Sequence, residues 1–272
     1  MKIIVGVDFS KSSDNAIDFI KNWAKKYIAE VELVHAYMPP MVDPSIPVGM
    51  IESNSVEIIE EYNKVLEKKV RNLRESGISA SYRVVVGDLL HGIIGKDDST
   101  SADLVVLGKT EKPDFIDRLI GSTSQHLVNE INIPLLIVPE NYSKRETKAI
   151  AYATQLEFEE TDVVKKVKEL SDRLKATMTF VKIKTPDELD INSDDRLLEK
   201  IKSVPGLEKT HVVTLEANSL KSGLKDFTDL NDSDLLVLVS HKRGLLDSIL
   251  APSQSKKLIS KLDIPILIHH FA

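Results

Sequence analysis

Residues 108 to 124 read GKTEKPDFIDRLIGSTS and bring glycines, lysines and hydroxyl side chains together in a short stretch. Such residues bind phosphate, because glycine exposes its backbone N–H while lysines and hydroxyls donate hydrogen bonds to phosphate oxygens. A Walker A loop, G-x-x-x-x-G-K-[ST], would need a glycine five residues before Gly108, where the chain has Asp103. The dinucleotide fingerprint G-x-G-x-x-G is also missing after the first predicted strand, where the sequence is GVDFSKSS. Both common phosphate loops are therefore excluded.

A second geometry for this stretch is open. Gly108 ends a predicted strand and Gly121 begins a predicted helix. The first N–H groups of a helix and its positive dipole end suit an anion, and Ser122, Thr123 and Ser124 would add hydroxyl donors. Alternatively, Gly121 is a turn residue and Ser122 a helix N-cap, which is the interpretation that spacing alone favours.

The chain contains an internal repeat, which fixes how these residues are positioned. The stretch DLVVLGK at Asp103 aligns with DLLVLVS at Asp234, an offset of 131 residues that holds to the last strand. At the beginnings of the halves, Ile3 aligns with Ile150 at an offset of 147. The first half therefore has 16 extra residues in its middle, where MVDPSIPVGMIESNS predicts a long loop.

Strands and helices alternate within each half. Continuous apolar runs such as LVVL and PLLIV are typical of strands covered on both faces, and the alternation predicts a parallel sheet with right-handed crossovers. We expect a linker at 140–148, between domains at 1–142 and 146–272. In the first half, strands are predicted at 2–7, 31–37, 81–86, 103–108 and 134–138, and helices near 12–28, 54–76, 88–97 and 121–131.

Composition excludes several classes of function. The chain has 36 basic and 42 acidic residues, and this mild acidic excess argues against a nucleic-acid surface. Without cysteine there are no disulfides, thiolate nucleophiles or cysteine metal sites, and the histidines lack metal-ligand spacing. The N-terminus does not have the pattern of a signal peptide, and no apolar run is long enough to span a membrane. We expect a cytoplasmic protein with no membrane partner and no metal site of its own.

These residues together resemble the universal stress protein family. That family carries G-2x-G-9x-G-[ST] between its fourth strand and fourth helix, and this chain has Gly108, Glu111 and then Gly121-Ser122 at that spacing. Asp8 stands in VGVDFS, similar to the family's V-x-V-D-x-S, while ELVHAY and INIPLLIVPE resemble its second and fifth strands. The resemblance covers both halves, so the chain is identified as a tandem member.

The resemblance implies an α/β fold with two tandem open-twisted five-stranded parallel sheets, helices on both faces and a pseudo-two-fold axis. Such domains are Rossmann-like and similar to adenine nucleotide alpha hydrolases. It also implies an ATP or AMP site in the first half, with Mg²⁺ if ATP is bound. Gly6, Val7 and Asp8 would line the adenine and ribose, and Ala36 would contact the base. The sugar and phosphates would be surrounded by Gly108, Thr110, Gly121, Ser122, Thr123 and Ser124. Asp8 has a second interpretation, as a cap or loop anchor.

The sequence departs from the family pattern in two places. Glu111 replaces the second glycine and puts a negative charge beside the expected phosphates, which predicts weakened binding; Lys109 and Lys112 beside it are expected to be exposed surface lysines. In the second half Gln155 replaces the aspartate, and Val239, Lys242 and Pro252 replace all three glycines. We therefore expect no nucleotide in the second half.

The apolar runs IPLLIVPE and IPILIHHF are the last strands of the halves. Family members dimerise with such strands side by side, so the second half is expected to supply this partner within one chain, giving an intrachain pseudo-dimer. Further homodimerisation is open, and no protein partner is identified. Three functions compete: a nucleotide-binding regulatory module, a nucleotide-free scaffold, and an enzyme on a related fold. Because no catalytic signature is found, we expect no enzyme, although slow ATP hydrolysis is left open.

Overall fold

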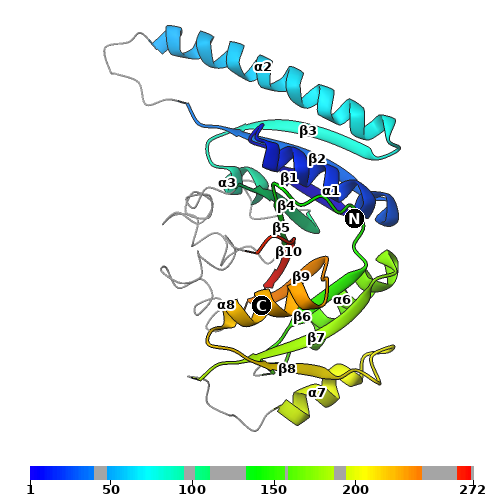
Figure 1. The fold of residues 1–272 in the computed structure, drawn as a ribbon. Coiled ribbons are helices and arrows are strands. Elements are labelled where there is room, and N and C mark those ends of the chain that lie inside the picture. Colours follow the sequence, from blue (N-terminus) through cyan, green and yellow to red (C-terminus); the bar gives the residue numbers. More distant parts are fainter. Residues whose placement is uncertain are drawn as a thin grey trace.

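The computed structural model describes residues 1–39, 48–94, 102–110, 133–156, 159–186, 194–240 and 262–270 (Figure 1). The first half consists of β1 (Lys2–Gly6), α1 (Lys11–Tyr27), β2 (Glu30–Tyr37), α2 (Val48–Glu75), β3 (Ser79–Val86), α3 (Leu89–Ile94), β4 (Leu104–Lys109) and β5 (Leu135–Pro139). The second consists of β6 (Ala149–Ala153), α6 (Thr161–Leu174), β7 (Thr177–Lys184), α7 (Asp194–Lys202), β8 (Val212–Glu216), α8 (Leu220–Leu230), β9 (Leu235–Ser240) and β10 (Ile266–His270). All five strands predicted in the first half are confirmed; the helix predicted at 121–131 lies outside the described residues.

The strands form one ten-stranded sheet in the order β3-β2-β1-β4-β5-β10-β9-β6-β7-β8. Within each half every pairing is parallel, and both halves have the same internal strand order. The halves meet where β5 and β10 pair antiparallel, with Leu267 opposite Leu136. The predicted α/β fold and the predicted pairing of the two last strands are both confirmed.

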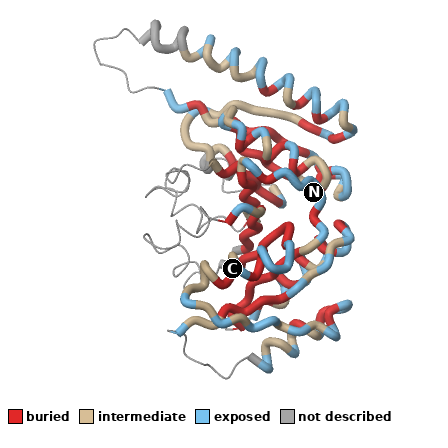
Figure 2. The backbone as a smooth tube through the Cα atoms, viewed as in Figure 1, coloured by how far each residue is buried: buried red, intermediate tan, exposed pale blue. Residues whose placement is uncertain are grey.

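Burial along the strands follows their place in this sheet. The central strand β4 is buried at every position, whereas the edge strands β3 and β8 are mostly half-buried or exposed. Figure 2 shows the buried backbone concentrated along the middle of the sheet and the exposed backbone towards its two ends. Continuous apolar runs therefore mark the strands that have a neighbour on each side and a covering layer on each face.

Helices cover both faces of the sheet, but the two faces differ. On one face a single hydrophobic cluster runs through both halves and includes residues of α1, α2, α6 and α7. On the other face the core is divided into two clusters, one under α3 and one under α8. The alternation of side chains along each strand produces this division, since Ile3 and Val5 belong to the shared cluster while Ile4 belongs to the α3 cluster.

Residues 48–55 form the start of α2, so the prediction of a long loop over 41–55 is wrong in its second part. Helix α2 begins at Val48 and has 28 residues, against 9 in its counterpart α7. No proline follows Pro47 until well beyond α2, and the backbone is therefore free to continue the helical hydrogen-bond ladder back to that point.

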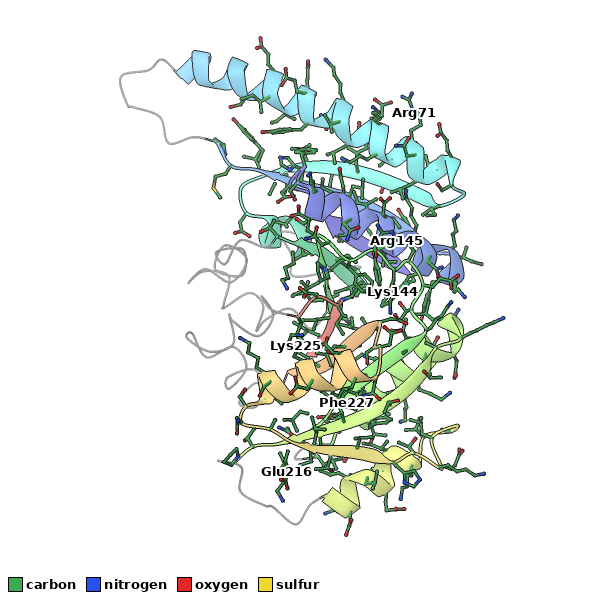
Figure 3. The ribbon with its side chains drawn as sticks, in the orientation of Figure 1. Arg71, Lys144, Arg145, Glu216, Lys225 and Phe227 are labelled. Carbon is green, nitrogen blue, oxygen red and sulfur yellow. The ribbon has the colours of Figure 1, made fainter. Side chains whose placement is uncertain are left out.

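The segment 140–148, expected to be a polar linker, is firmly bonded to the first half. Asn15 Nδ2 of α1 donates to the carbonyls of Pro139 (2.7 Å) and Tyr142 (2.9 Å). Trp23 Nε1 donates to Thr147 Oγ1 at 3.2 Å. Figure 3 labels Lys144 and Arg145 in this segment, where the two halves meet. The connection is thus part of the packed structure of the chain.

The aspartates that begin the two repeat units, Asp103 and Asp234, share one structural task. Asp103 Oδ2 accepts the backbone N–H of Lys2 at 2.7 Å, at the start of β1. Asp234 Oδ2 accepts those of Lys148 and Ala149, at the start of β6. Each carboxylate therefore fixes the first strand of its half to the strand beside it.

Asp234 also receives Lys144 Nζ at 2.8 Å, and its side chain is 6% exposed. Burial by itself would raise the pKa of this carboxyl, but the hydrogen bonds from Lys144 and from the backbone of Lys148 and Ala149 outweigh it and hold the pKa below its ordinary value. The ionised form is therefore the one that the folded state stabilises.

We predict that Asp234→Asn lowers the free energy of unfolding by about 2 kcal/mol at neutral pH, because three donors lose a charged acceptor. Since the folded pKa is depressed, this contribution is complete above the unfolded pKa of about 3.9 and is lost as the pH falls through the folded pKa. Urea unfolding at several pH values measures the difference between the two proteins. Asp232→Asn is the matched control: Asp232 contacts the same lysine but is 91% exposed, and its loss costs less than about 0.5 kcal/mol. Equal losses for the two variants would contradict this account.

Candidate functional site

Those predicted site residues that the structure describes lie at the point where the strand order of the first half reverses. Strand β1 lies between β2 and β4. After β1 the chain adds β2 and β3 on one side of it, and then crosses to add β4 and β5 on the other side. Gly6, Val7 and Asp8 stand at the carboxyl end of β1, with Ala36 near the end of β2 and Gly108 near the end of β4. In open α/β sheets ligands bind at such a point, beyond the carboxyl ends of the strands.

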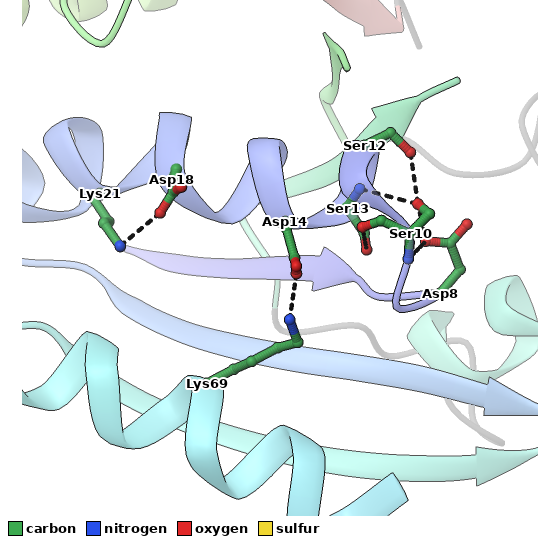
Figure 4. Close-up of polar contacts among 8 residues, drawn as sticks. All are labelled: Asp8, Ser10, Ser12, Ser13, Asp14, Asp18, Lys21 and Lys69. Carbon is green, nitrogen blue, oxygen red and sulfur yellow. Dashed lines mark hydrogen bonds and ion pairs between the residues drawn. The ribbon is translucent and has the colours of Figure 1, made fainter. Parts of the chain in front are cut away.

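Asp8 is the one exposed carboxylate of this group. Its Oδ1 accepts the backbone N–H of Ser10 at 3.0 Å and the Ser10 hydroxyl at 2.5 Å, and Figure 4 shows the other oxygen turned away from Ser10. Partial burial would raise the pKa of Asp8, but hydrogen bonds from the Ser10 side chain and backbone and from the Ser13 side chain outweigh it and lower the pKa. Asp8 is thus an ionised acceptor with one oxygen directed away from the loop.

The same contacts show that Asp8 also anchors the loop. Ser10 is the N-cap of α1, with its Oγ accepting the backbone N–H of Ser13 at 3.3 Å. The Ser10 and Ser12 hydroxyls lie 2.8 Å apart. The carboxylate therefore holds the N-cap in place from one side, as the second interpretation of Asp8 expected.

An aromatic cluster that the sequence did not point to lies beneath this loop. His35 of β2 is buried, and its Nδ1 donates to the Val7 carbonyl at 2.6 Å; a carbonyl only accepts, so Nδ1 carries the proton. The rings of Phe9 and Tyr62 each have their centroids 4.4 Å from that of His35. Phe9 is held at a φ of 61°, a conformation costly for a bulky residue. This packing supports the bend of the chain that directs Asp8 outward.

Two of the three predicted glycines, Gly6 and Gly108, make room for neighbouring side chains and backbone. A Cβ on Gly108 would lie 2.2 Å from the backbone C and O of Ser12, so the glycine lets the start of α1 approach β4. A Cβ on Gly6 would meet only side-chain ends, of Leu107 and Leu89. Packing by itself therefore accounts for Gly108, and its place in a nucleotide site stays a prediction.

Other predicted residues of the phosphate side have different outcomes. Thr110 follows β4 directly and is half-buried. Lys109, expected to be exposed, is 5% exposed, and its Nζ donates to the Leu262 carbonyl of the second half at 2.9 Å. The prediction was wrong because β4 is an inner strand with the second half nearby. The remaining predicted residues lie outside the described part of the chain: Glu111, Lys112, Gly121, Ser122, Thr123 and Ser124.

In the second half the equivalent place is built differently. Gln155, the counterpart of Asp8, is buried, and its Nε2 donates to the carbonyl of Ile183, the counterpart of Ala36, at 3.3 Å. Val239 stands where the first half has Gly108. In this half the Gln155 side chain thus bonds to the residue whose first-half counterpart, Ala36, is expected to contact the base.

The described residues show neither a metal-binding cluster nor a membrane-spanning helix. Among the described residues no group of three or more His, Asp or Glu side chains could hold a metal ion. None of the helices in the same part of the chain combines the length and apolar character needed to cross a bilayer.

Comparison with known proteins agrees with this architecture. A family model described as the universal stress protein family matches residues 1–139 and 146–270. Universal stress protein MJ0531 of Methanocaldococcus jannaschii is 29% identical over 142 residues, covering 50% of this chain and 81% of that protein. Universal stress protein YxiE of Bacillus subtilis is 26% identical over 144 residues, covering 50% of this chain and 97% of its own length. The structure of a universal stress protein from Archaeoglobus fulgidus covers 99% of this chain and 96% of its own, with a TM-score of 0.73 and 15% identity, which speaks for the fold alone.

We predict that Gly108→Ala lowers the free energy of unfolding by about 3 kcal/mol, because the new methyl group would collide with backbone that cannot rotate away. Gly6→Ala is the matched control and costs about 1 kcal/mol, since flexible leucine ends can move. Chemical denaturation of both variants measures the two losses. A Gly108→Ala protein as stable as the control would mean that α1 does not approach β4 this closely.

Proposed function

The chain belongs to the universal stress protein family, and we propose that its first half binds ATP or AMP weakly at the switch point between β1 and β4. Binding would report the energy state of the cell to a stress response, in a regulatory or protective role in the cytoplasm. The second half would act as the fixed structural partner of the first. We propose a binding protein rather than an enzyme, because the sequence carries no catalytic signature such as G-x-S-x-G.

The observation that carries this proposal is the Asp8 carboxylate. It is ionised, fixed through Oδ1 by Ser10, and turned with its other oxygen away from the loop (Figure 4). A carboxylate at the end of a strand of an α/β sheet is the acceptor that ribose hydroxyls need. Gly108 and Thr110 at the end of β4 lie across the same switch point, on the side proposed for the sugar and phosphates.

Weak affinity follows from the sequence after β4. Glu111 stands where the family pattern has a glycine, and its charge would be added near an already anionic ligand. Like charges a few ångströms apart in a poorly solvated cleft repel by on the order of a few kcal/mol, and each 1.4 kcal/mol is tenfold in affinity. Bound Mg²⁺ would offset part of this repulsion when the ligand is ATP.

A nucleotide-free scaffold is the second candidate, and a specific observation favours it. The packing of α1 on β4 accounts for Gly108 without any ligand, and Asp8 anchors its own loop. On this alternative, the first half would keep the shape of the site for structural reasons and the protein would act through contacts with other proteins.

We predict that calorimetry detects ATP or AMP binding to the full chain with a Kd between about 0.1 and 1 mM. Asp8→Ala should raise the Kd about tenfold, because the ribose loses a charged acceptor worth about 1.4 kcal/mol. Asp18→Ala is the control: it removes a carboxylate from α1, the helix that follows the Asp8 loop, and this carboxylate pairs with Lys21 on the surface. No heat from ATP, ADP or AMP at millimolar concentration would overturn the proposal.

Glu111→Gly separates the two candidates. If the first half is a weakened nucleotide site, this variant binds ATP at least tenfold more tightly than the native chain, as removal of about 1.4 kcal/mol of repulsion requires. The same titration measures it, with AMP expected to gain less because it carries fewer phosphate charges. If the native chain shows no binding and Glu111→Gly creates it, the scaffold is the better description. ATP retained by the native protein through purification would exclude the scaffold.

A further inference from the structure

The three aromatic rings beneath the Asp8 loop, those of Phe9, His35 and Tyr62, have no aromatic counterparts in the second half. By the repeat offsets, the equivalent positions there are Leu156, Lys182 and Ser193. Both halves nevertheless bend in the same way after their first strand, since Phe9 has a φ of 61° and Leu156 a φ of 57°. The backbone bend by itself therefore forms without aromatic rings.

The two halves differ in the side chain that stands just before this bend. In the first half it is Asp8, which is exposed and has one oxygen turned away from the loop (Figure 4). In the second half it is Gln155, which is buried and donates to the Ile183 carbonyl. The same backbone thus directs this side chain outward in one half and inward in the other, and the aromatic rings accompany the outward direction.

The hydrogen bond from His35 acts on the peptide unit that leads into Asp8. The Val7 carbonyl, which accepts the Nδ1–H of His35 at 2.6 Å, lies in one plane with the N–H of Asp8. The peptide bonds of the described residues are all trans, so this N–H points opposite to the carbonyl. The imidazole therefore fixes the plane from which the Asp8 side chain departs.

The imidazole itself has little freedom to turn away from Val7. The ring centroids of Phe9 and Tyr62 each lie 4.4 Å from that of His35, and these two rings stack on one another at 5.3 Å. Tyr62 stands one residue before the position equivalent to Asp194, where α7 begins. The longer helix α2 of the first half thus brings this ring to the loop.

We propose that His35 is a positioning residue of the nucleotide site: its Nδ1–H holds the Val7–Asp8 peptide, and the rings of Phe9 and Tyr62 keep the imidazole in that orientation. Its effect on ligand affinity rests on the proposed function. The placement of Asp8, in contrast, is a property of the chain without ligand and is measured separately.

Two substitutions in the full-length protein separate the donor from the bulk of the ring. His35→Phe keeps an aromatic ring and removes the donor, whereas His35→Asn loses part of the ring and keeps a donor, because its Nδ2 takes the place of Nδ1. We expect His35→Phe to move the pKa of Asp8 back towards its ordinary value as the contacts from Ser10 loosen, and His35→Asn to leave it close to native. Titration of the Asp8 carboxyl carbon by ¹³C NMR, without nucleotide, measures this pKa.

Nucleotide affinity is measured on the same variants by calorimetry. His35→Phe should bind ATP or AMP about fivefold more weakly than the native chain, the difference that one net hydrogen bond supplies, and His35→Asn should restore most of the loss. Thr147→Val is the control: it removes the buried acceptor of Trp23 Nε1 on α1 and should lower stability in urea without changing the Asp8 pKa or the affinity. If the native chain binds no nucleotide, the proposed function fails and the Asp8 titration still decides the role of His35.

An unchanged Asp8 pKa in His35→Phe overturns the proposal, whatever the affinities. An equal change in His35→Asn overturns it too, because the donor would then be irrelevant, and an equal change in Thr147→Val would mean that any loosening of the fold is sufficient. Should His35→Phe not fold, ¹⁵N NMR of the native protein gives the test. The proton of the neutral imidazole should be on Nδ1, and a proton on Nε2 overturns the proposal.

Discussion

The antiparallel pairing of β5 with β10 is the interaction on which the architecture depends. It joins two parallel sheets through their last strands, so that neither apolar edge is left open to other chains. One hydrophobic cluster then extends over the same face of both halves, and contacts outside the β5–β10 pair add to the connection between them. The Arg173 guanidinium lies 4.8 Å from the centre of the Tyr27 ring, and Lys109 donates across to the Leu262 carbonyl. Each half therefore covers the edge strand of the other and contributes to a shared hydrophobic core.

The two halves have the same backbone conformation at several equivalent positions, although the side chains there differ. The left-handed residues that follow the first strand and the first helix recur at equivalent positions, as Phe9 with Leu156 and Ile28 with Lys175. Each first strand is held by an aspartate. At the switch points the chemistry diverges, because an exposed carboxylate in one half corresponds to a buried amide in the other.

The first half also shows how one residue can serve two purposes. Asp8 holds the N-cap of α1 with one oxygen and turns the other away from the loop, while Gly108 lets the helix start approach β4. On the proposed function, the acceptor would be held in position before a ligand binds, because the contacts that begin the helix also fix Asp8. As a result, the sequence pattern that suggests binding at Asp8 and Gly108 is also the pattern that packing requires, and the sequence alone does not separate the two.

The sequence by itself determined the repeat and the strands of the first half, since apolar runs and offsets are local or periodic signals. The pairing of the last strands was predicted from the resemblance to the family. The sequence also placed Gly6 to Asp8, Ala36 and Gly108 at one edge of the sheet, because carboxyl ends of parallel strands meet there. Only the tertiary structure showed that Lys109 is buried and that Gly108 lies against the backbone at the start of α1. It also showed that the Gln155 amide donates a hydrogen bond to the Ile183 carbonyl. Those outcomes depend on which distant residue fills the space beside each side chain, and contacts of that kind leave no periodic signal in the chain.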